Sequence, residues 1–134
     1  MGKFLKKIAI ILVVMAIVIG ISKIAYKVNM STYETRADER INKVIQLQGA
    51  SLESAKVVVD GYDSKNGCWY KRIVFDDDPE INYDYEYNKS DNEVRIWRAD
   101  GNVSLDLSDK EAKYPEYDVI FEKDQVKEII ERNY

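Results

Sequence analysis

The sequence predicts an α+β protein: an N-terminal transmembrane helix, then one helix packed on an antiparallel β-meander of about five strands, with a short C-terminal helix. Three observations favour this class. Residues 8–21 are apolar without interruption, and residues 31–48 repeat apolar side chains at helical spacing. Segments between residues 57 and 107 alternate polar and apolar side chains, as strands do. We therefore expect a membrane anchor at residues 1–27 and one small extracytoplasmic domain at residues 28–134.

The apolar run, IAIILVVMAIVIGI at residues 8–21, has lysines on both sides. A transmembrane helix needs about 17–20 apolar residues. The run reaches nineteen residues when it is extended through Tyr26, with Ser22 and Lys23 as interruptions. A lysine near a helix end can lift its ammonium group to the membrane interface, so an anchor that contacts lipid is favoured. The anchor residues are Ile8, Ile11, Leu12, Val13, Val14, Ile17, Val18 and Ile21.

Two other interpretations of this run stay open. A basic start followed by an apolar core of about 7–15 residues is also typical of a cleaved signal peptide, although Gly20 and Ser22 form only a weak cleavage site. A buried core helix is disfavoured because the run has no polar face. For a retained anchor, the more basic N-terminal flank is expected in the cytoplasm and the C-terminal domain outside the cell membrane.

Charge is distributed unevenly along the chain. Residues 1–27 carry five lysines and no acidic residue, so the other 107 residues hold 15 basic and all 24 acidic side chains, a net charge of −9. Such an acidic domain disfavours nucleic acid as a partner. The chain has no histidine, which is the commonest general base, and one cysteine, Cys68, which has no partner for an internal disulfide. We therefore expect no enzymatic activity and no cofactor.

The segment at residues 31–48 predicts an amphipathic helix. Ser31 and Glu34 have the spacing of a capping box, which would start the helix, and Gly49 would end it. The absence of proline and glycine between residues 21 and 31 also allows this helix to be nearly continuous with the anchor. The residues that share its apolar face are Tyr33, Ala37, Ile41, Val44, Ile45 and Gln48.

The following segments predict strands and turns. Residues 57–59 and 69–75 are rich in β-branched and aromatic residues, and Asn66-Gly67 is a strong hairpin signal between them. Pro79 cannot donate to a strand ladder and is expected to end the second strand. The clearest strand carries Ile81, Tyr83, Tyr85 and Tyr87 on one face; strands at residues 94–99, 103–107 and 117–121 and a helix that begins at Asp124 follow.

A two-residue turn at Asp100-Gly101 sets the expected register of these strands. The tyrosine face is then predicted to place Tyr83 opposite Ile96 and Tyr85 opposite Val94.

This register brings Asp84 against Arg95 on the outer face, where Trp97 also lies. Trp97 is either covered by the C-terminal segment or is a contact residue, because exposed tryptophans are common at binding hot spots. The candidate interaction residues are Trp97, Arg95 and Asp84.

The acidic turn at residues 76–80 offers hard oxygen ligands that suit Ca²⁺. Its low-ranking metal candidates are Asp76, Asp77, Asp78 and Glu80. Their spacing does not match a calcium-binding EF-hand loop, and a solvated acidic turn before a proline is the favoured explanation. Asp84 and Glu86 are paired carboxylates, but they are expected on an open sheet face with no cleft, so hydrolase chemistry is disfavoured.

The lysine-flanked anchor, the capped helix, and residues 74–80, VFDDDPE, before an alternating tyrosine strand together resemble a known family. It consists of small single-pass membrane proteins of low-GC Gram-positive bacteria, classified as a domain of unknown function. The resemblance spans residues 3–107 and implies a location in the bacterial cell envelope, without implying an activity.

Together these features predict a membrane-anchored, non-enzymatic accessory or interaction module that binds an envelope or membrane protein. The alternative is an exported sensor domain that binds a small ligand or cation through the acidic turn 76–80. A pocket would favour the sensor, whereas a flat apolar patch around Trp97 would favour protein interaction.

Overall fold

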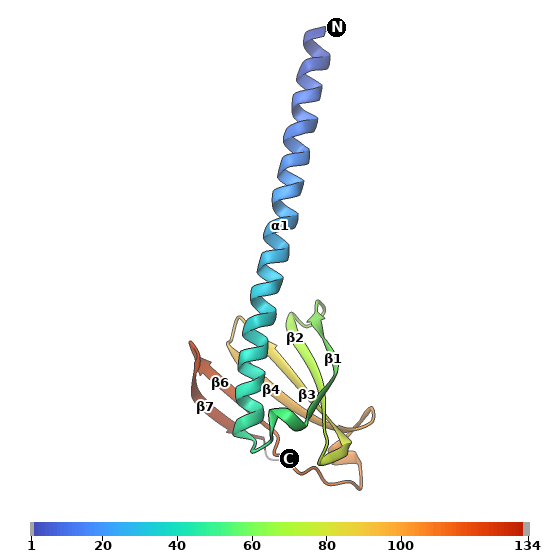
Figure 1. The fold of residues 1–134 in the computed structure, drawn as a ribbon, viewed down its shortest axis with the longest axis vertical. Coiled ribbons are helices and arrows are strands. Elements are labelled where there is room, and N and C mark those ends of the chain that lie inside the picture. The colour runs from blue at the N-terminus through green and yellow to red at the C-terminus, as the bar shows by residue number, and fades with distance from the viewer. Residues whose placement is uncertain (1, 133–134) are drawn as a thin grey trace. The chain divides into compact units, whose positions relative to one another are not determined.

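The computed structural model describes residues 2–132, which form one long helix followed by an antiparallel sheet (Figure 1). The α+β class is therefore confirmed. The chain divides into two compact units, Met1–Tyr33 and Glu34–Tyr134. The helix is α1 (Gly2–Leu47), and the strands are β1 (Ala55–Asp63), β2 (Cys68–Phe75), β3 (Asp78–Asn88), β4 (Glu93–Asp100), β5 (Val103–Ser104), β6 (Tyr117–Glu122) and β7 (Gln125–Glu131). Two 3₁₀ turns are η1 (Leu52–Ser54) and η2 (Leu105–Leu107).

The first unit is the N-terminal part of α1, whose apolar side chains are exposed. Ile11 and Leu12 are 58% and 60% exposed, for example. This helix is long and apolar enough to cross a membrane, a property that signal sequences share.

The predicted capping box at Ser31 is wrong, because Ser31 lies inside α1. The Thr32 hydroxyl donates to the Val28 carbonyl oxygen at 3.0 Å, which satisfies this polar side chain within the helix. With no glycine or proline to interrupt it, the helix continues to Leu47.

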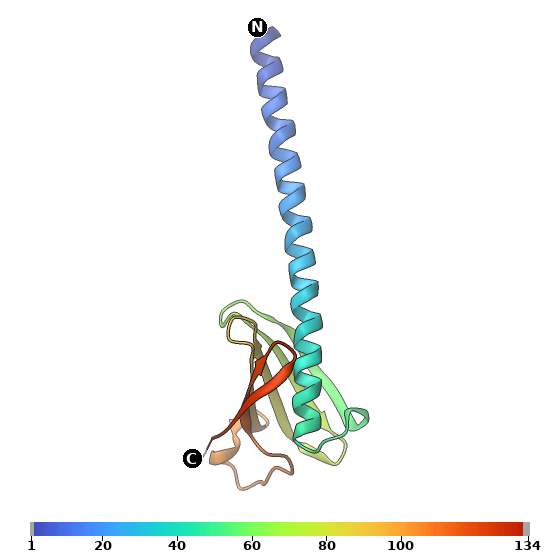
Figure 2. The same ribbon diagram turned by 90° about the vertical axis from the view of Figure 1, so that its left-hand side faces the viewer.

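The core of the second unit lies between the last part of α1 and one face of the sheet (Figures 1 and 2). Ile41, Val44 and Ile45 are fully buried, as the helical spacing predicted. The tyrosine face of β3 is also confirmed, since Tyr83, Tyr85 and Tyr87 are at most 1% exposed. The strand order is β1-β2-β3-β4-β6-β7, and β5 pairs with β4.

The β3–β4 register differs from the prediction by two residues. Tyr85 lies opposite Ile96 and Tyr87 opposite Val94, so each side chain keeps its predicted face but changes its partner. The loop that joins the strands is longer than expected, because Asn92 adopts a φ of 49° and bonds elsewhere. Its side-chain amide donates to the carbonyl oxygens of Phe121 and Lys123 at 3.1 and 2.9 Å.

The C-terminal third corrects two further predictions. The strand expected at residues 103–107 is only β5, and β6 instead pairs with β4 over three residue pairs. The segment expected as a C-terminal helix is β7. Its apolar spacing fits a helix, but Lys123 adopts a φ of 58°, which turns the chain back onto β6. Lys43 of α1 donates to the Asp124 carbonyl oxygen at 2.6 Å and holds this turn.

The β1–β2 hairpin forms as Asn66-Gly67 predicted. The Asp63 carboxylate accepts from the Lys65 amide at 3.0 Å, and Gly67 has a φ of 65°. The strand β2 ends at Phe75, but Pro79 lies inside β3 rather than in a loop. It sits where the β2–β3 register shifts, a position that tolerates a missing donor.

The packing of α1 against the sheet predicts that two side-chain truncations on this helix lower the stability of the fold by very different amounts. Ile41→Ala is expected to lower the free energy of unfolding by about 2–5 kcal/mol, because it leaves a cavity against the sheet. Leu47→Ala is the control, since Leu47 is 44% exposed on the same helix, and is expected to change it by about 0.5 kcal/mol or less. Urea unfolding of the full-length chain in detergent measures both, and equal losses would contradict this packing.

Candidate functional site on the open face of the sheet

The face of the sheet opposite α1 carries polar and charged side chains that none of the described helices covers. We call it the open face. Alternation along each strand creates it, because every second residue of β3 and its neighbours points away from the tyrosine core. Its central residues are Tyr70, Arg72, Asp84, Glu86, Arg95 and Trp97.

An ion pair between Arg72 and Asp84 links β2 and β3 on the open face. Arg72 on β2 lies opposite Asp84 on β3, and its Nε and one terminal nitrogen donate to the two carboxylate oxygens at 2.8 and 3.0 Å. Hydrogen bonding to Asp84 raises the pKa of Arg72. The predicted Asp84–Arg95 pair is therefore wrong: Arg95 lies opposite Glu86 and pairs with Glu93 at 3.4 Å.

Trp97 lies opposite Asp84 and is 40% exposed. The C-terminal segment contributes one side chain to it: the Arg132 guanidinium carbon lies 4.0 Å from the ring centroid. This guanidinium is held by Asp118 at 3.2 Å and Glu116 at 3.7 Å. Arg132 of the C-terminal segment therefore covers part of the ring and leaves the rest accessible, and a role of Trp97 as a contact residue stays a prediction.

Glu86 occupies the centre of the open face. Partial burial raises the pKa of its carboxyl group, and hydrogen bonding to Trp97 and the charge of Arg95 oppose this shift. Among the residues that the structure describes, no lysine or arginine nitrogen lies within 4 Å of its carboxylate. Glu86 thus differs from Asp84 and Glu93, which are each paired with an arginine.

Two shallow hollows share Glu86 as a wall. The first, the tyrosine hollow, has a volume of about 290 Å³. It is lined by Val59, Gly61, Tyr62, Asp63, Tyr70 and Glu86. The second has a volume of about 230 Å³ and is lined by Asn66, Cys68, Glu86, Asn88 and Arg95. The expectation of an open face without a cleft is therefore corrected at Glu86.

Cys68 lies at the base of the second hollow but is only 4% exposed. Burial, together with the charges of Glu86 and Asp63, raises the pKa of its thiol to about 11. The thiol is therefore protonated at neutral pH, which disfavours nucleophilic chemistry at this position.

The acidic turn at residues 76–80 holds the segment at residues 108–116. Asp77 accepts from the Lys113 ammonium at 2.5 Å and from the Tyr114 hydroxyl, and these bonds lower its pKa. Asp78 accepts from the Tyr83 hydroxyl at 2.6 Å. Within residues 2–132, no cluster of three or more acidic or cysteine side chains is placed to hold a metal ion. Cation binding at Asp76, Asp77, Asp78 and Glu80 stays a prediction that this geometry does not favour.

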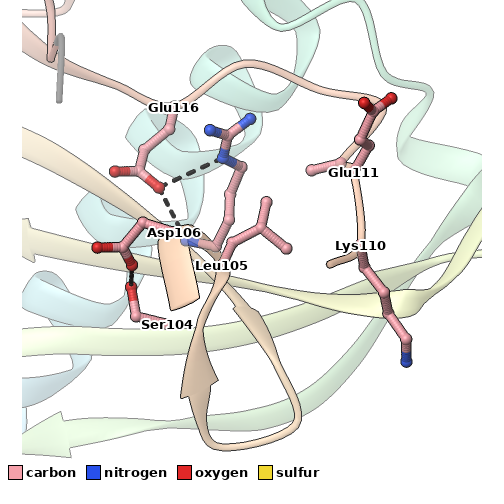
Figure 3. A pocket seen from close by; sticks show the side chains of 8 residues that line it. Ser104, Leu105, Asp106, Lys110, Glu111 and Glu116 are labelled. Atoms are coloured by element: carbon pink, nitrogen blue, oxygen red, sulfur yellow. Dashed lines mark hydrogen bonds and ion pairs between the residues drawn. The ribbon is translucent and has the colours of Figure 1, made fainter. Parts of the chain in front are cut away.

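A further hollow of about 330 Å³ lies beside η2 (Figure 3). Arg98 and Glu116 form one wall, and the Arg98 Nε donates to the carboxylate at 3.3 Å. Lys110 points away from this pair in Figure 3 and bonds to Asp100 at 2.9 Å. Arg98, Glu116 and Lys110 are therefore paired within the chain, whereas Asp106 and Glu111, which also line this hollow, are exposed to solvent rather than partly buried like Glu86.

The raised pKa of Glu86 predicts how its removal depends on pH. The ionised carboxylate is less favourable in the folded protein than in the unfolded chain, so Glu86→Gln is expected to raise the melting temperature at neutral pH. This gain in melting temperature should disappear below pH 4.5, the ordinary pKa of a glutamate carboxyl group. At such a pH, Glu86 is protonated in both the folded and the unfolded protein.

Thermal unfolding between about pH 3 and pH 8 measures this difference. Asp100→Asn is the control of opposite sign, because hydrogen bonds from Lys110 and Ser108 lower the pKa of Asp100. The Asp100→Asn variant is expected to melt at a lower temperature than the wild type at neutral pH and at the same temperature at acid pH. A Glu86→Gln effect that did not change with pH would contradict the argument.

Comparison with known proteins places the chain in a family. A family model described as "Protein of unknown function (DUF3139)" matches residues 3–85, which cover α1, β1, β2 and most of β3. No curated protein and no solved structure matches the chain significantly. The match confirms the family resemblance of the anchor, the helix and the tyrosine strand, over a shorter range than residues 3–107. The chain belongs to the family described as "Protein of unknown function (DUF3139)".

Proposed function

We propose that this protein is a non-enzymatic, membrane-anchored interaction module that binds an envelope or membrane protein through its open face. The observation that carries the proposal is Trp97, a large aromatic side chain that is 40% exposed among ordered charged residues. Interface hot spots are enriched in tryptophan, tyrosine and arginine, and all three types occur together here.

The open face is ordered before any partner binds. Arg72 and Asp84 form two parallel hydrogen bonds, and Arg132 is held over Trp97 by two carboxylates. Side chains fixed in this way lose little conformational entropy on association, which favours binding. Carboxylates committed to neighbouring arginines are, in contrast, poorly placed to act as general acids or bases.

The N-terminal part of α1 supports the location in this proposal. Its exposed apolar side chains suit lipid rather than water, and the lysines on either side suit the two membrane interfaces. The larger number of lysines before the run favours a cytoplasmic N-terminus and a domain on the outer side of the cell membrane.

Partner binding predicts a selective effect of Trp97→Ala. Affinity purification of the full-length protein from its own host in mild detergent is expected to recover one stoichiometric protein. Trp97→Ala should weaken this recovery by about tenfold or more, because hot-spot truncations cost about 2 kcal/mol or more. Leu107→Ala is the matched control, since Leu107 is an apolar residue that is 79% exposed outside the open face. Equal recovery with all three proteins would refute the proposal.

The proposed topology predicts where cysteine labels react. In a Cys68→Ala background, a cysteine introduced by Ser64→Cys is expected to react with a membrane-impermeant maleimide in intact cells. One introduced by Lys3→Cys should react only after the cells are permeabilised, since positive flanks stay in the cytoplasm. Intact mass spectrometry provides the second measurement. A mass that lacks about the first 22 residues would identify a cleaved signal peptide instead of an anchor.

A further inference from the structure

We propose that the tyrosine hollow binds an alkylammonium group, and that the partner of the open face inserts a lysine side chain there. This inference rests on the proposed function and adds the chemistry of the partner. Two tyrosines, two carboxylates and one valine surround the hollow. This set combines anionic groups for an ammonium ion, aromatic rings for a cation and an apolar wall for a methylene stem.

The hollow exists because of Gly61. Gly61 lies opposite Tyr70, and Tyr70 lies opposite Glu86, so these residues form one row across three strands. A Cβ atom placed on Gly61 would meet no other atom within 4 Å, and its φ lies outside the left-handed region. The backbone therefore does not require glycine here. Glycine is also unfavourable inside a strand, so what it provides at this position is open space.

The charges around the hollow suit a cation. The nearest arginines on the open face are committed, since Arg72 pairs with Asp84 and Arg95 pairs with Glu93. Glu86 keeps a carboxylate without an ion-pair partner among the described residues. Asp63, whose carboxylate accepts hydrogen bonds from Lys65 and Asn66, adds a second negative charge to the lining. A cation that enters would offset the unfavourable burial of Glu86. An anion would be repelled by the negative charges of Glu86 and Asp63, so the hollow disfavours anionic ligands.

The aromatic walls favour an ammonium ion with an apolar stem over a bare metal ion. The faces of tyrosine rings attract organic cations, and metal ions would need more oxygen ligands than two carboxylates supply. Val59 offers an apolar contact for the methylene groups of a lysine side chain.

A fluorescence titration of the full-length protein in detergent tests this site. The probe is a tetralysine peptide, with a tetranorleucine peptide as the uncharged comparison and a tetraarginine peptide as the guanidinium comparison. Trp97 is expected to report binding because it is 40% exposed and lies opposite Asp84, the open-face residue next to Glu86 on β3. Tetralysine is expected to bind at least tenfold more tightly than either other peptide.

Two variants separate the hollow from general attraction to an acidic domain. Gly61→Val fills the hollow without changing charge, and Glu86→Gln removes the charge with little change in shape. Each is expected to weaken tetralysine binding tenfold or more. Asp106→Asn removes an acidic side chain of η2, outside the tyrosine hollow, and should leave the affinity unchanged. Gly61→Val should also melt no lower than the wild type, because valine suits a strand and its Cβ atom has open space there.

Equal tetralysine affinity for the wild type, Gly61→Val and Glu86→Gln would overturn the ammonium site. Equal binding of the lysine and arginine peptides would overturn its selectivity. Partner recovery from the host separates this inference from the proposed function. Loss of the partner with Trp97→Ala but not with Gly61→Val would leave the open face as the interface and refute the lysine insertion. Loss with both variants supports the two proposals together.

Discussion

The burial of the β3 tyrosines under residues 34–47 of α1 is the constraint on which the rest of this domain depends. Each ring is buried, so each hydroxyl needs a hydrogen-bond partner, since a buried polar group without one costs about 1–3 kcal/mol. Tyr83 donates to Asp78, Tyr85 to Gln48 and Tyr87 to Asn92, at 2.6, 2.6 and 3.0 Å. One aromatic stripe thus positions the β2–β3 turn, the end of α1 and the loop before β4.

The same stripe determines the open face. A strand that sends every second tyrosine into the core must send the residues between them to the other side, so Asp84 and Glu86 face away from α1. Their environments then diverge because of their neighbours on β2. Asp84 lies opposite Arg72 and is neutralised, whereas Glu86 lies opposite Tyr70 and is not. The unpaired charge is therefore a consequence of strand register rather than of composition.

Local patterns predicted the faces of the elements, because helical spacing and alternation act within one segment. The buried face around Ile41, the tyrosine face of β3 and the Asn66-Gly67 turn are of this kind. The pairing partners and the C-terminal strand were missed for a shared reason. Asn92 and Lys123 adopt left-handed conformations that depend on bonds between distant segments, and Arg40 of α1 donates to the Lys123 carbonyl oxygen. Tertiary contacts of this range override local propensity.

The candidate site also contains some features that local sequence patterns predicted and others that depend on contacts between distant segments. Trp97, Arg95 and Asp84 lie on the open face as predicted, because only alternation was needed to place them there. The hollow beside Glu86 depends on three strands in register, which no single segment encodes. Gly61 carried the one available signal, since a glycine inside a strand often marks a close approach or a space. Because Trp97 lies opposite Asp84 and Glu86 is the next open-face residue of β3, a protein at Trp97 would lie beside the carboxylate that lines the hollow. The two proposed contacts are therefore neighbours on one face, so a single partner can make both.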